Sequence, residues 1–220
     1  STIIKALSRI VSPRSGRILV NGKDIAGLPR RDLARYVGVV PQMPLLPSAF
    51  TAFEIVLMGR NPHLGLFQYE GERDMAITRR AMEKTGTQSL AERRIDELSG
   101  GEIQRLVMAR VLAQEPKAIL LDEPTSHLDM GNQLKILQVI KDLANDGMTI
   151  VMASHFPDHA FLVANVVAIL NNGQIAQVGA PDEVITEKNL KATYGVDVRI
   201  VQLEEGGLRK ACFCQHNGDQ

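Results

Sequence analysis

The chain has 220 residues, of which 45% are hydrophobic, and its 25 basic side chains are balanced by 25 acidic ones. This length suits one large domain, or one domain with a subdomain, and the composition provides enough apolar residues for a full core. The balanced charge excludes a general electrostatic attraction to nucleic acid or to a membrane surface. No apolar run approaches the ~18 residues that a membrane-spanning helix needs.

The first part of the chain predicts two helices, a hairpin and a buried strand. An apolar helical pattern follows Ser1-Thr2, which suits the start of a capped helix. Asn21-Gly22 separates two short runs and predicts an antiparallel hairpin. A short polar helix is expected at 30–35, and the apolar run at 36–40 predicts a buried strand that ends shortly before Gln42.

Residues from about 43 to 114 predict a helical insertion between two strands of the core. Its first part, 43–53, is rich in proline and apolar residues, which suits either a partner surface or packing against the next helix. That helix is expected to begin at Thr51, with a capping box closed by Glu54. A loop is expected at 60–65, and further helices follow it.

A capping box precedes a long apolar-periodic run near the middle of the chain. Ser99 is expected to cap this helix, and Glu102 to reach back to the Ser99 amide. Gly100 and Gly101 remove side chains from the first turn, so that an anion can approach bare N–H groups at the positive end of the helix dipole. The segment therefore predicts either an anion site or an ordinary helix start.

A short, wholly apolar run at 118–121 predicts a parallel strand that is covered on both faces. It ends in Asp122-Glu123, at the edge where α/β folds place ligands. Asp122 suits an Mg²⁺ ion bound through water, and Glu123 suits a general base that polarises an attacking water. The alternative is a purely structural strand end.

A helix is predicted at 133–144 and a buried strand at 149–153, which ends in Ser154-His155. Because the carboxyl ends of parallel strands meet at one edge, a single crevice could collect Gln42, the carboxylate pair and His155. Each polar residue taken alone is equally compatible with an ordinary surface position.

The last third of the chain predicts a second hairpin at 166–178 around Asn171-Asn172-Gly173, then short helices at 182–186 and 190–194. A variable C-terminal tail is expected at 196–220. It contains Cys212, Cys214 and His216, which together could bind a metal ion. The alternative is that the two cysteines are a free pair.

Three motifs resemble those of the ATP-binding subunit of ABC transporters. The segment 98–102, LSGGE, is similar to the LSGGQ/E signature, 118–123 to the Walker B strand with its catalytic glutamate, and 126–129, SHLD, to the D-loop. The resemblance covers nearly the whole chain. It implies an α/β fold with a P-loop NTPase-like, mostly parallel sheet core, an antiparallel β-subdomain and a helical insertion, all within a single ABC ATPase domain over 1–220.

The resemblance assigns ATP and Mg²⁺ as cofactors and gives several residues a role toward them. Ser1 matches the hydroxyl that binds Mg²⁺, and Thr2 the residue next to the α-phosphate, as if the chain began just after the lysine of a G-x-x-x-x-G-K-[ST] phosphate loop. Gln42 matches the Q-loop glutamine, which binds Mg²⁺ and water, and Asp122 completes the metal site. Without that lysine and its glycines, this 220-residue form is expected to bind MgATP poorly and to hydrolyse little.

The resemblance also implies the catalytic pair and a dimer. Glu123 matches the catalytic glutamate, and His155 the switch histidine that contacts the γ-phosphate. In this family two copies face head to tail, so that the signature of one copy and its D-loop face the ATP held by the other. The nucleotide-binding residues on that side are then Ser99, Gly100, Gly101, Glu102 and Asp129.

The run VLMGRNPHLG, together with TSHLD, resembles the branch of ABC importers that take up metal chelates: ferric siderophores, haem or cobalamin. It implies a peripheral position on the cytoplasmic face of the membrane. The implied partners are a second copy of the chain, membrane permease subunits and, indirectly, a substrate-binding protein, with no nucleic acid.

Two other functions are compatible with parts of the sequence. A non-catalytic ABC-like module could dimerise or regulate a transporter without the phosphate loop, although the presence of Glu123, His155 and Ser99 argues against it. A soluble ABC ATPase of DNA repair or translation would carry long coiled coils or tandem domains, and neither is visible. His127 has no histidine or cysteine at ligand spacing and is not expected to bind a metal.

Overall fold

A computed structural model describes residues 1–65, 67–203 and 209–214. Its contacts divide the chain into two compact units, Ser1–Ala153 and Ser154–Gln220. The expectation of one domain over 1–220 stays a prediction.

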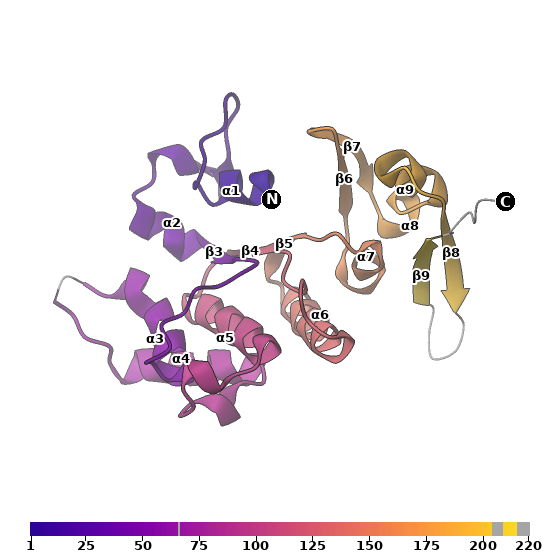
Figure 1. Cartoon of the computed structure of the whole chain (residues 1–220). Helices are drawn as coiled ribbons and strands as arrows, with labels where there is room; N and C mark the ends of the chain where they lie inside the picture. The colour runs from indigo at the N-terminus through magenta and orange to yellow at the C-terminus, as the bar shows by residue number, and fades with distance from the viewer. Residues whose placement is uncertain (66, 204–208, 215–220) are drawn as a thin grey trace. The chain divides into compact units, whose positions relative to one another are not determined.

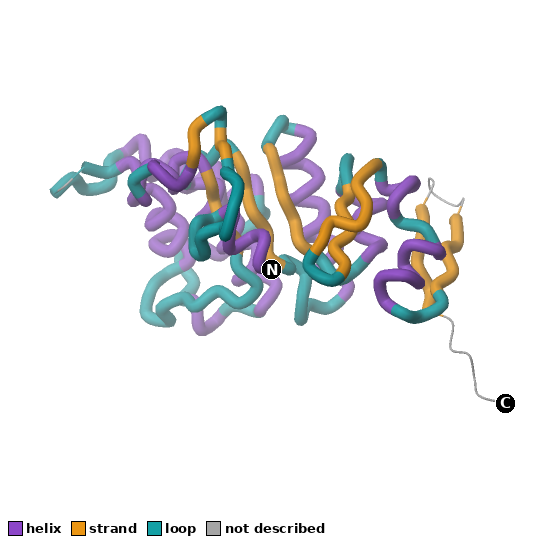
Figure 2. The backbone as a smooth tube through the Cα atoms, turned by 90° about the horizontal axis from the view of Figure 1, so that it is seen from above, coloured by secondary structure: helices purple, strands orange, loops and turns teal. Residues whose placement is uncertain are grey.

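The first unit is built on three parallel strands, β3 (Val37–Val40), β4 (Ala118–Asp122) and β5 (Thr149–Ala153). Strand β4 is central, and its register places Val40 opposite Leu121 and Asp122 opposite Ala153. Strands β3 and β4 are mostly buried, as apolar parallel strands covered on both faces should be. The prediction of a buried strand at 149–153 was wrong in its burial, because β5 has no buried residue and Val151 is 39% exposed. Helix α6 (Met130–Asn145) lies beside β5 (Figure 2).

The segment before β3 packs on the sheet, where Ile4, Ile25 and Leu33 share a buried core with Val37 of β3 and Leu120 of β4. Helix α1 (Thr2–Leu7) is followed by the antiparallel strands β1 (Leu19–Val20) and β2 (Lys23–Asp24), a 3₁₀-helix η1 (Ile25–Gly27) and α2 (Arg30–Tyr36). The β1–β2 turn contains Asn21 and Gly22 with φ angles of 50° and 74°, a conformation that asparagine and glycine tolerate best. The predicted hairpin is therefore present, but shorter than expected.

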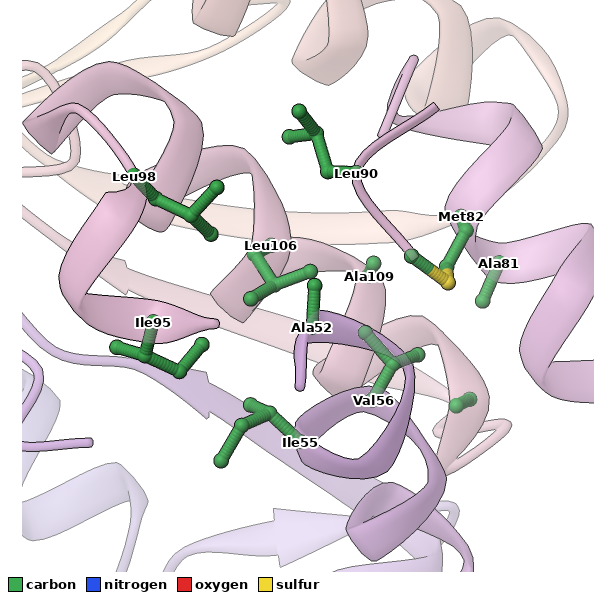
Figure 3. Close-up of a cluster of buried hydrophobic side chains, with 11 residues drawn as sticks. Ala52, Ile55, Val56, Ala81, Met82, Leu90, Ile95, Leu98, Leu106 and Ala109 are labelled. Atoms are coloured by element: carbon green, nitrogen blue, oxygen red, sulfur yellow. The ribbon is translucent and has the colours of Figure 1, made fainter. Parts of the chain in front are cut away.

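The insertion between β3 and β4 is helical, as predicted. It contains α3 (Ala52–Leu57), η2 (Met58–His63), α4 (Glu72–Lys84), η3 (Gln88–Leu90), η4 (Ile95–Glu97) and α5 (Gly100–Ala113). Figure 1 shows α3, α4 and α5 packed together on one side of the strands. Their shared core contains Ile55 and Val56 of α3, Met82 of α4 and Leu106 of α5, all fully buried (Figure 3).

The predicted loop at 60–65 was wrong, because Met58–His63 form the 3₁₀-helix η2. Its Arg60 is 2% exposed, and its guanidinium bonds to Asp74 at 2.8 Å, to the Ala113 carbonyl at 2.7 Å and to Glu115 at 2.8 Å. Composition suggested a loop because Gly59 and Pro62 interrupt a helical pattern. The buried guanidinium, which cannot be read from local sequence, holds the segment in a tight helical form.

In its described residues, the second unit holds two antiparallel strand pairs and three short helices. Strands β6 (Val167–Asn171) and β7 (Gln174–Gly179) form the predicted second hairpin. The helices are α7 (Pro157–Val163), α8 (Pro181–Val184) and α9 (Glu187–Tyr194). The expected variable tail contains a further antiparallel pair, β8 (Val198–Leu203) and β9 (Arg209–Cys214), which the sequence analysis did not predict.

Candidate functional site

Two parallel strands bring a glutamine and a carboxylate together at one edge of the sheet. Val40 of β3 and Leu121 of β4 are paired in the parallel register. Gln42 lies two residues beyond Val40, and Glu123 lies two residues beyond Leu121. The side chains consequently meet, and Gln42 Nε2 donates to Glu123 Oε2 at 2.9 Å. The structure thus brings two of the predicted site residues into contact, and the crevice that would collect all of them stays a prediction.

Glu123 is held in an unusual backbone conformation. Its φ is 49°, a left-handed value that costs most residues other than glycine about 1–3 kcal/mol. Its amide donates to the Ala153 carbonyl at 3.0 Å, which extends the β4–β5 ladder by one bond. The left-handed turn redirects the chain after β4, so that the Glu123 carboxylate lies at the edge of the sheet beside Gln42.

Ser126 is a second partner of Glu123 that the sequence analysis placed only within the D-loop match. Its backbone N–H donates to the Glu123 carbonyl at 3.1 Å, and its hydroxyl donates to Glu123 Oε2 at 2.9 Å. The Glu123–Ser126 turn therefore folds the hydroxyl back onto the carboxylate. A serine three residues after a carboxylate in a turn is the only local signal for this contact, and it is a weak one.

Asp122 lies beside the first residue of the chain. The Ser1 nitrogen donates to the two Asp122 carboxylate oxygens at 2.7 and 2.8 Å, and α1, which begins at Thr2, packs against β4. This contact is made by the Ser1 nitrogen, so the metal site shared by the Ser1 hydroxyl and Asp122 stays a prediction. Their hydroxyl and carboxylate oxygens, with the amide oxygen of Gln42, are the hard donors that suit Mg²⁺.

The start of α5 forms the predicted capping box. Glu102 Oε2 accepts from the Ser99 amide and the Ser99 hydroxyl, both at 2.8 Å, and the Ser99 hydroxyl accepts from the Glu102 amide. The hydrogen bonds from Ser99, the backbone one foremost, lower the pKa of Glu102. Gly100 is exposed in the first turn, whereas Gly101 is buried.

Asp129 caps α6, the helix that follows the D-loop segment. Its Oδ1 accepts from the Asn132 amide at 2.8 Å and its Oδ2 from the Asn132 side chain at 2.6 Å. These hydrogen bonds, the backbone one first, lower the pKa of Asp129. The carboxylate therefore stays ionised and fixed in direction at neutral pH.

His155 belongs to the unit that begins at Ser154. The predicted approach of His155 to Glu123 stays a prediction. Among the predicted site residues of the first unit, the structure joins Gln42 to Glu123 and Ser1 to Asp122, and it joins Ser99 to Glu102 within one helix start.

The suggested metal site at the tail gains no support. Cys212 and Cys214 lie on β9, and His216 lies outside the described residues. Within ranges 1–65, 67–203 and 209–214, no three His, Cys, Asp or Glu side chains are grouped closely enough to hold a metal ion. Burial raises the pKa of the Cys212 thiol to about 12, with a further contribution from Asp158, so the thiolate that a metal needs is disfavoured.

Comparison with known proteins identifies the family. Residues 1–126, more than half of the chain, match the ABC transporter family. The chain belongs to the ABC transporter family. The family prediction drawn from the signature, the Walker B strand and the D-loop is therefore confirmed.

Curated relatives of this ABC transporter family chain include ATP-binding proteins of two transport systems. The achromobactin transport ATP-binding protein CbrD of Dickeya dadantii is 38% identical over 203 residues, which is 91% of this chain and 75% of CbrD. The hemin import ATP-binding protein HmuV of Gloeobacter violaceus is 40% identical, over 92% of this chain and 75% of HmuV. The sequence likeness thus extends well beyond residue 126.

Solved ABC transporter structures show the same fold. A transporter described as of metal-chelate type, in an inward-facing conformation, superimposes with a TM-score of 0.85 at 29% identity, over 98% of this chain and 82% of that one. The predicted α/β fold with a mostly parallel sheet core, an antiparallel β-subdomain and a helical insertion is confirmed.

Proposed function

We propose that this ABC transporter family chain is the ATP-hydrolysing subunit of an importer of metal chelates: ferric siderophores, haem or cobalamin. The observation that carries the proposal is the contact of Gln42 with Glu123 at the sheet edge, next to Asp122. The names of the relatives and the motif 56–65 support the choice of cargo.

Two residue groups divide the proposed chemistry. Ser1, Gln42 and Asp122 would hold Mg²⁺, which when bound would neutralise charge on the phosphates. Glu123 acts as the general base toward an attacking water, with His155 orienting that water and contacting the γ-phosphate. The left-handed turn at Glu123 and its bonds from Gln42 and Ser126 fix the carboxylate before substrate arrives, which is the pre-organisation that phosphoryl transfer needs.

The other nucleotide-binding residues act on the ATP of a second copy. We place Ser99, Gly100, Gly101 and Glu102 at the phosphates of that ATP, because the α5 start offers N–H groups and a positive dipole end to an anion. Thr2, by contrast, lies beside the α-phosphate of the ATP that its own chain binds. Asp129 faces the dimer interface. ATP is thus held between two copies placed head to tail.

A membrane permease is the third partner of this proposal. The segment after Gln42 exposes Met43, Leu45 and Phe50, with Leu45 97% exposed. A cavity of about 430 Å³ opens on the helical insertion, and both signs of charge surround its apolar floor; it is lined by Phe53, Arg79, Arg80, Met82, Glu83, Gln88, Ala91 and Glu92. Such an apolar surface with a polar rim suits a protein partner.

The position at the membrane follows from these partners. Among the residues that the structure describes, none of the helices combines the length and the apolar character that crossing a membrane requires. We therefore place the chain on the cytoplasmic face, held there by the permease, and indirectly coupled to a substrate-binding protein on the other side.

ATP turnover by the full-length protein tests the proposal, with Glu123→Gln as the decisive variant. Removal of a general base lowers kcat by about 10² to 10⁴-fold. Glu72→Gln, at an exposed carboxylate in the first turn of α4, is the matched control and leaves turnover unchanged. Equal turnover in both variants would contradict the assignment of Glu123. Absence of turnover in the unsubstituted protein would favour the non-catalytic module instead.

A further inference from the structure

Asn132 donates hydrogen bonds to the Asp129 carboxylate from both its backbone and its side chain. Its backbone N–H donates to Asp129 Oδ1 at 2.8 Å, and its Nδ2 donates to Asp129 Oδ2 at 2.6 Å. Both oxygens of Asp129 are thus bound by one residue, and the plane of the carboxylate is fixed. The backbone bond alone is the ordinary helix cap, so the side chain supplies something beyond capping.

The same side chain contacts the start of α5. A Cβ atom built on Gly101 would lie 2.4 Å from Asn132 Cγ, 2.5 Å from Oδ1 and 2.8 Å from Nδ2, so the amide lies directly on the bare Cα. Arg105, one turn further along α5, donates from Nη1 to Asn132 Oδ1 at 3.4 Å. The Asn132 amide therefore touches Asp129 on one side and two residues of α5 on the other.

We propose that Asn132 is a positioning residue that sets the D-loop carboxylate Asp129 relative to the signature helix start at Ser99–Gly101. This inference rests on the proposed function, which places both groups against the nucleotide of a second copy. Two groups that must meet one nucleotide together need a fixed spacing, and a misplacement of about 1 Å is costly. The Asn132 amide joins the two groups by hydrogen bonds and close packing, whereas the D-loop side chain of Leu128 makes only an ordinary van der Waals approach, 3.8 Å from a Cβ built on Gly100.

The chemistry of the side chain explains why an amide suits this position. Its Nδ2 donates to the Asp129 carboxylate while its Oδ1 accepts from Arg105, and only an amide presents both kinds of group in one plane. Aspartate at 132 would place a second carboxylate against Asp129. Alanine at 132 would keep the backbone cap of α6 and lose the contact with α5.

The test measures closure of the dimer separately from binding of nucleotide. In the full-length protein carrying Glu123→Gln, which blocks hydrolysis, sedimentation gives the dimer dissociation constant with MgATP, and equilibrium dialysis gives the affinity of the monomer for nucleotide. We expect Asn132→Ala to raise the dimer dissociation constant about tenfold and to leave nucleotide affinity within about twofold. Asn132→Asp is expected to weaken the dimer further.

Gln138→Ala is the matched control. Gln138 is an exposed residue of the same helix. Its side-chain amide donates to the Asp142 carboxylate at 2.8 Å, which keeps its hydrogen bond within α6. This variant should dimerise like the Glu123→Gln parent. An equal loss for Gln138→Ala and Asn132→Ala, or unchanged dimerisation of Asn132→Ala, would overturn the inference while the head-to-tail dimer stands. If the parent itself does not dimerise with MgATP, the proposed function fails and the inference with it.

A second measurement tests the contact with Gly101 itself. Gly101→Ala alone must displace the Asn132 amide and should weaken the dimer. In an Asn132→Ala background the three amide atoms nearest to the added Cβ are gone, so Gly101→Ala should cost less there. Equal effects of Gly101→Ala in both backgrounds would show that the amide does not require the glycine.

Discussion

Arg60 offers the sharpest test of what holds the helical insertion together. Its side chain is 3% exposed and pairs with Asp74, itself 13% exposed, so both charges have left water. Replacement by methionine keeps much of the volume but leaves the Asp74 carboxylate and the Ala113 carbonyl without this donor. Breaking a buried ion pair by removing one partner costs about 3–5 kcal/mol.

The lower end of that range applies to Arg60→Met. Asp74 keeps a hydrogen bond from the Gly71 amide at 3.1 Å, and the Glu115 carboxylate is 48% exposed, so its pair with Arg60 contributes under about 1 kcal/mol. We therefore expect the free energy of unfolding to fall by about 3 kcal/mol, measured by urea denaturation followed by circular dichroism.

The effect should also depend on pH. The hydrogen bond from Arg60, followed by that from Gly71, lowers the pKa of Asp74 in the folded chain. A lowered pKa adds stability above the unfolded value of about 3.9, and this stability disappears as pH falls through the folded pKa. The difference between Arg60→Met and the parent is therefore largest at neutral pH and shrinks below about pH 4.

Lys84→Met is the matched control, since it removes an ion pair with Asp146 whose side chains are 52% and 60% exposed. That change should cost under about 1 kcal/mol. The reasoning fails if Arg60→Met costs no more than Lys84→Met, or if its cost grows in acid.

Three further predictions follow from single contacts. Gly59→Ala places a Cβ 2.2 Å from the Arg110 carbonyl oxygen, which is backbone and cannot swing away, so unfolding free energy should fall by about 2 kcal/mol in urea titrations. Ser99→Ala removes the α5 cap and should cost about 1 kcal/mol. The Ser99 backbone N–H, which contributes most to the lowered pKa of Glu102, remains in Ser99→Ala, and only the smaller contribution of the hydroxyl is lost. The acid loss of stability below about pH 4.3 should therefore weaken only in part in that variant. Cys212, whose pKa is raised to about 12, should react slowly with iodoacetamide at pH 8, as read by mass spectrometry of its peptide.

Each of these three predictions has a control or an outcome that would contradict it. Gly27→Ala introduces a Cβ into open space and should be nearly neutral. For the capping box, an unchanged pH profile in Ser99→Ala would contradict the contribution of the Ser99 hydroxyl, and a complete loss of the acid dependence would contradict the leading role of the Ser99 backbone N–H. For the thiols, the exposed Cys214 two residues away serves as the comparison, and equal labelling of both cysteines would contradict the burial of Cys212.

The features that the sequence predicted well are those whose cause is local. Strands β3, β4 and β5 are short apolar runs, and the capping boxes at Thr51 and Ser99 need only two residues three apart. The approach of Gln42 to Glu123 was also foreseeable, because parallel strands in register end at the same edge. In each case, the pattern of residue types along a short stretch of the chain determines the element or the contact.

Arg60 escaped prediction because its burial depends on residues far apart in the sequence. It meets groups 14 to 55 residues away, and without those partners a run containing glycine and proline reads as a loop. The β8–β9 pair is different, because its partners lie only 6 to 16 positions apart, from Leu203 with Arg209 to Val198 with Cys214. The run 198–203 is rich in β-branched residues, a local strand signal that the expectation of a variable tail overlooked.

Gly101 shows why a correct motif can still leave its physical cause open. The sequence indicated that both glycines of the signature keep the first turn of α5 bare for an anion, and Gly100 is indeed exposed. Gly101 is instead buried against Asn132, a residue 31 positions later. The absence of a side chain at Gly101 therefore also makes room for α6, the helix that follows the D-loop segment. Under the proposed function Gly100 serves the phosphate, and under the proposed role of Asn132 the bare Gly101 helps to join the two motifs. A substitution at Gly101 is therefore expected to act through Asp129 as well as through the nucleotide, which the paired variants at 101 and 132 can separate.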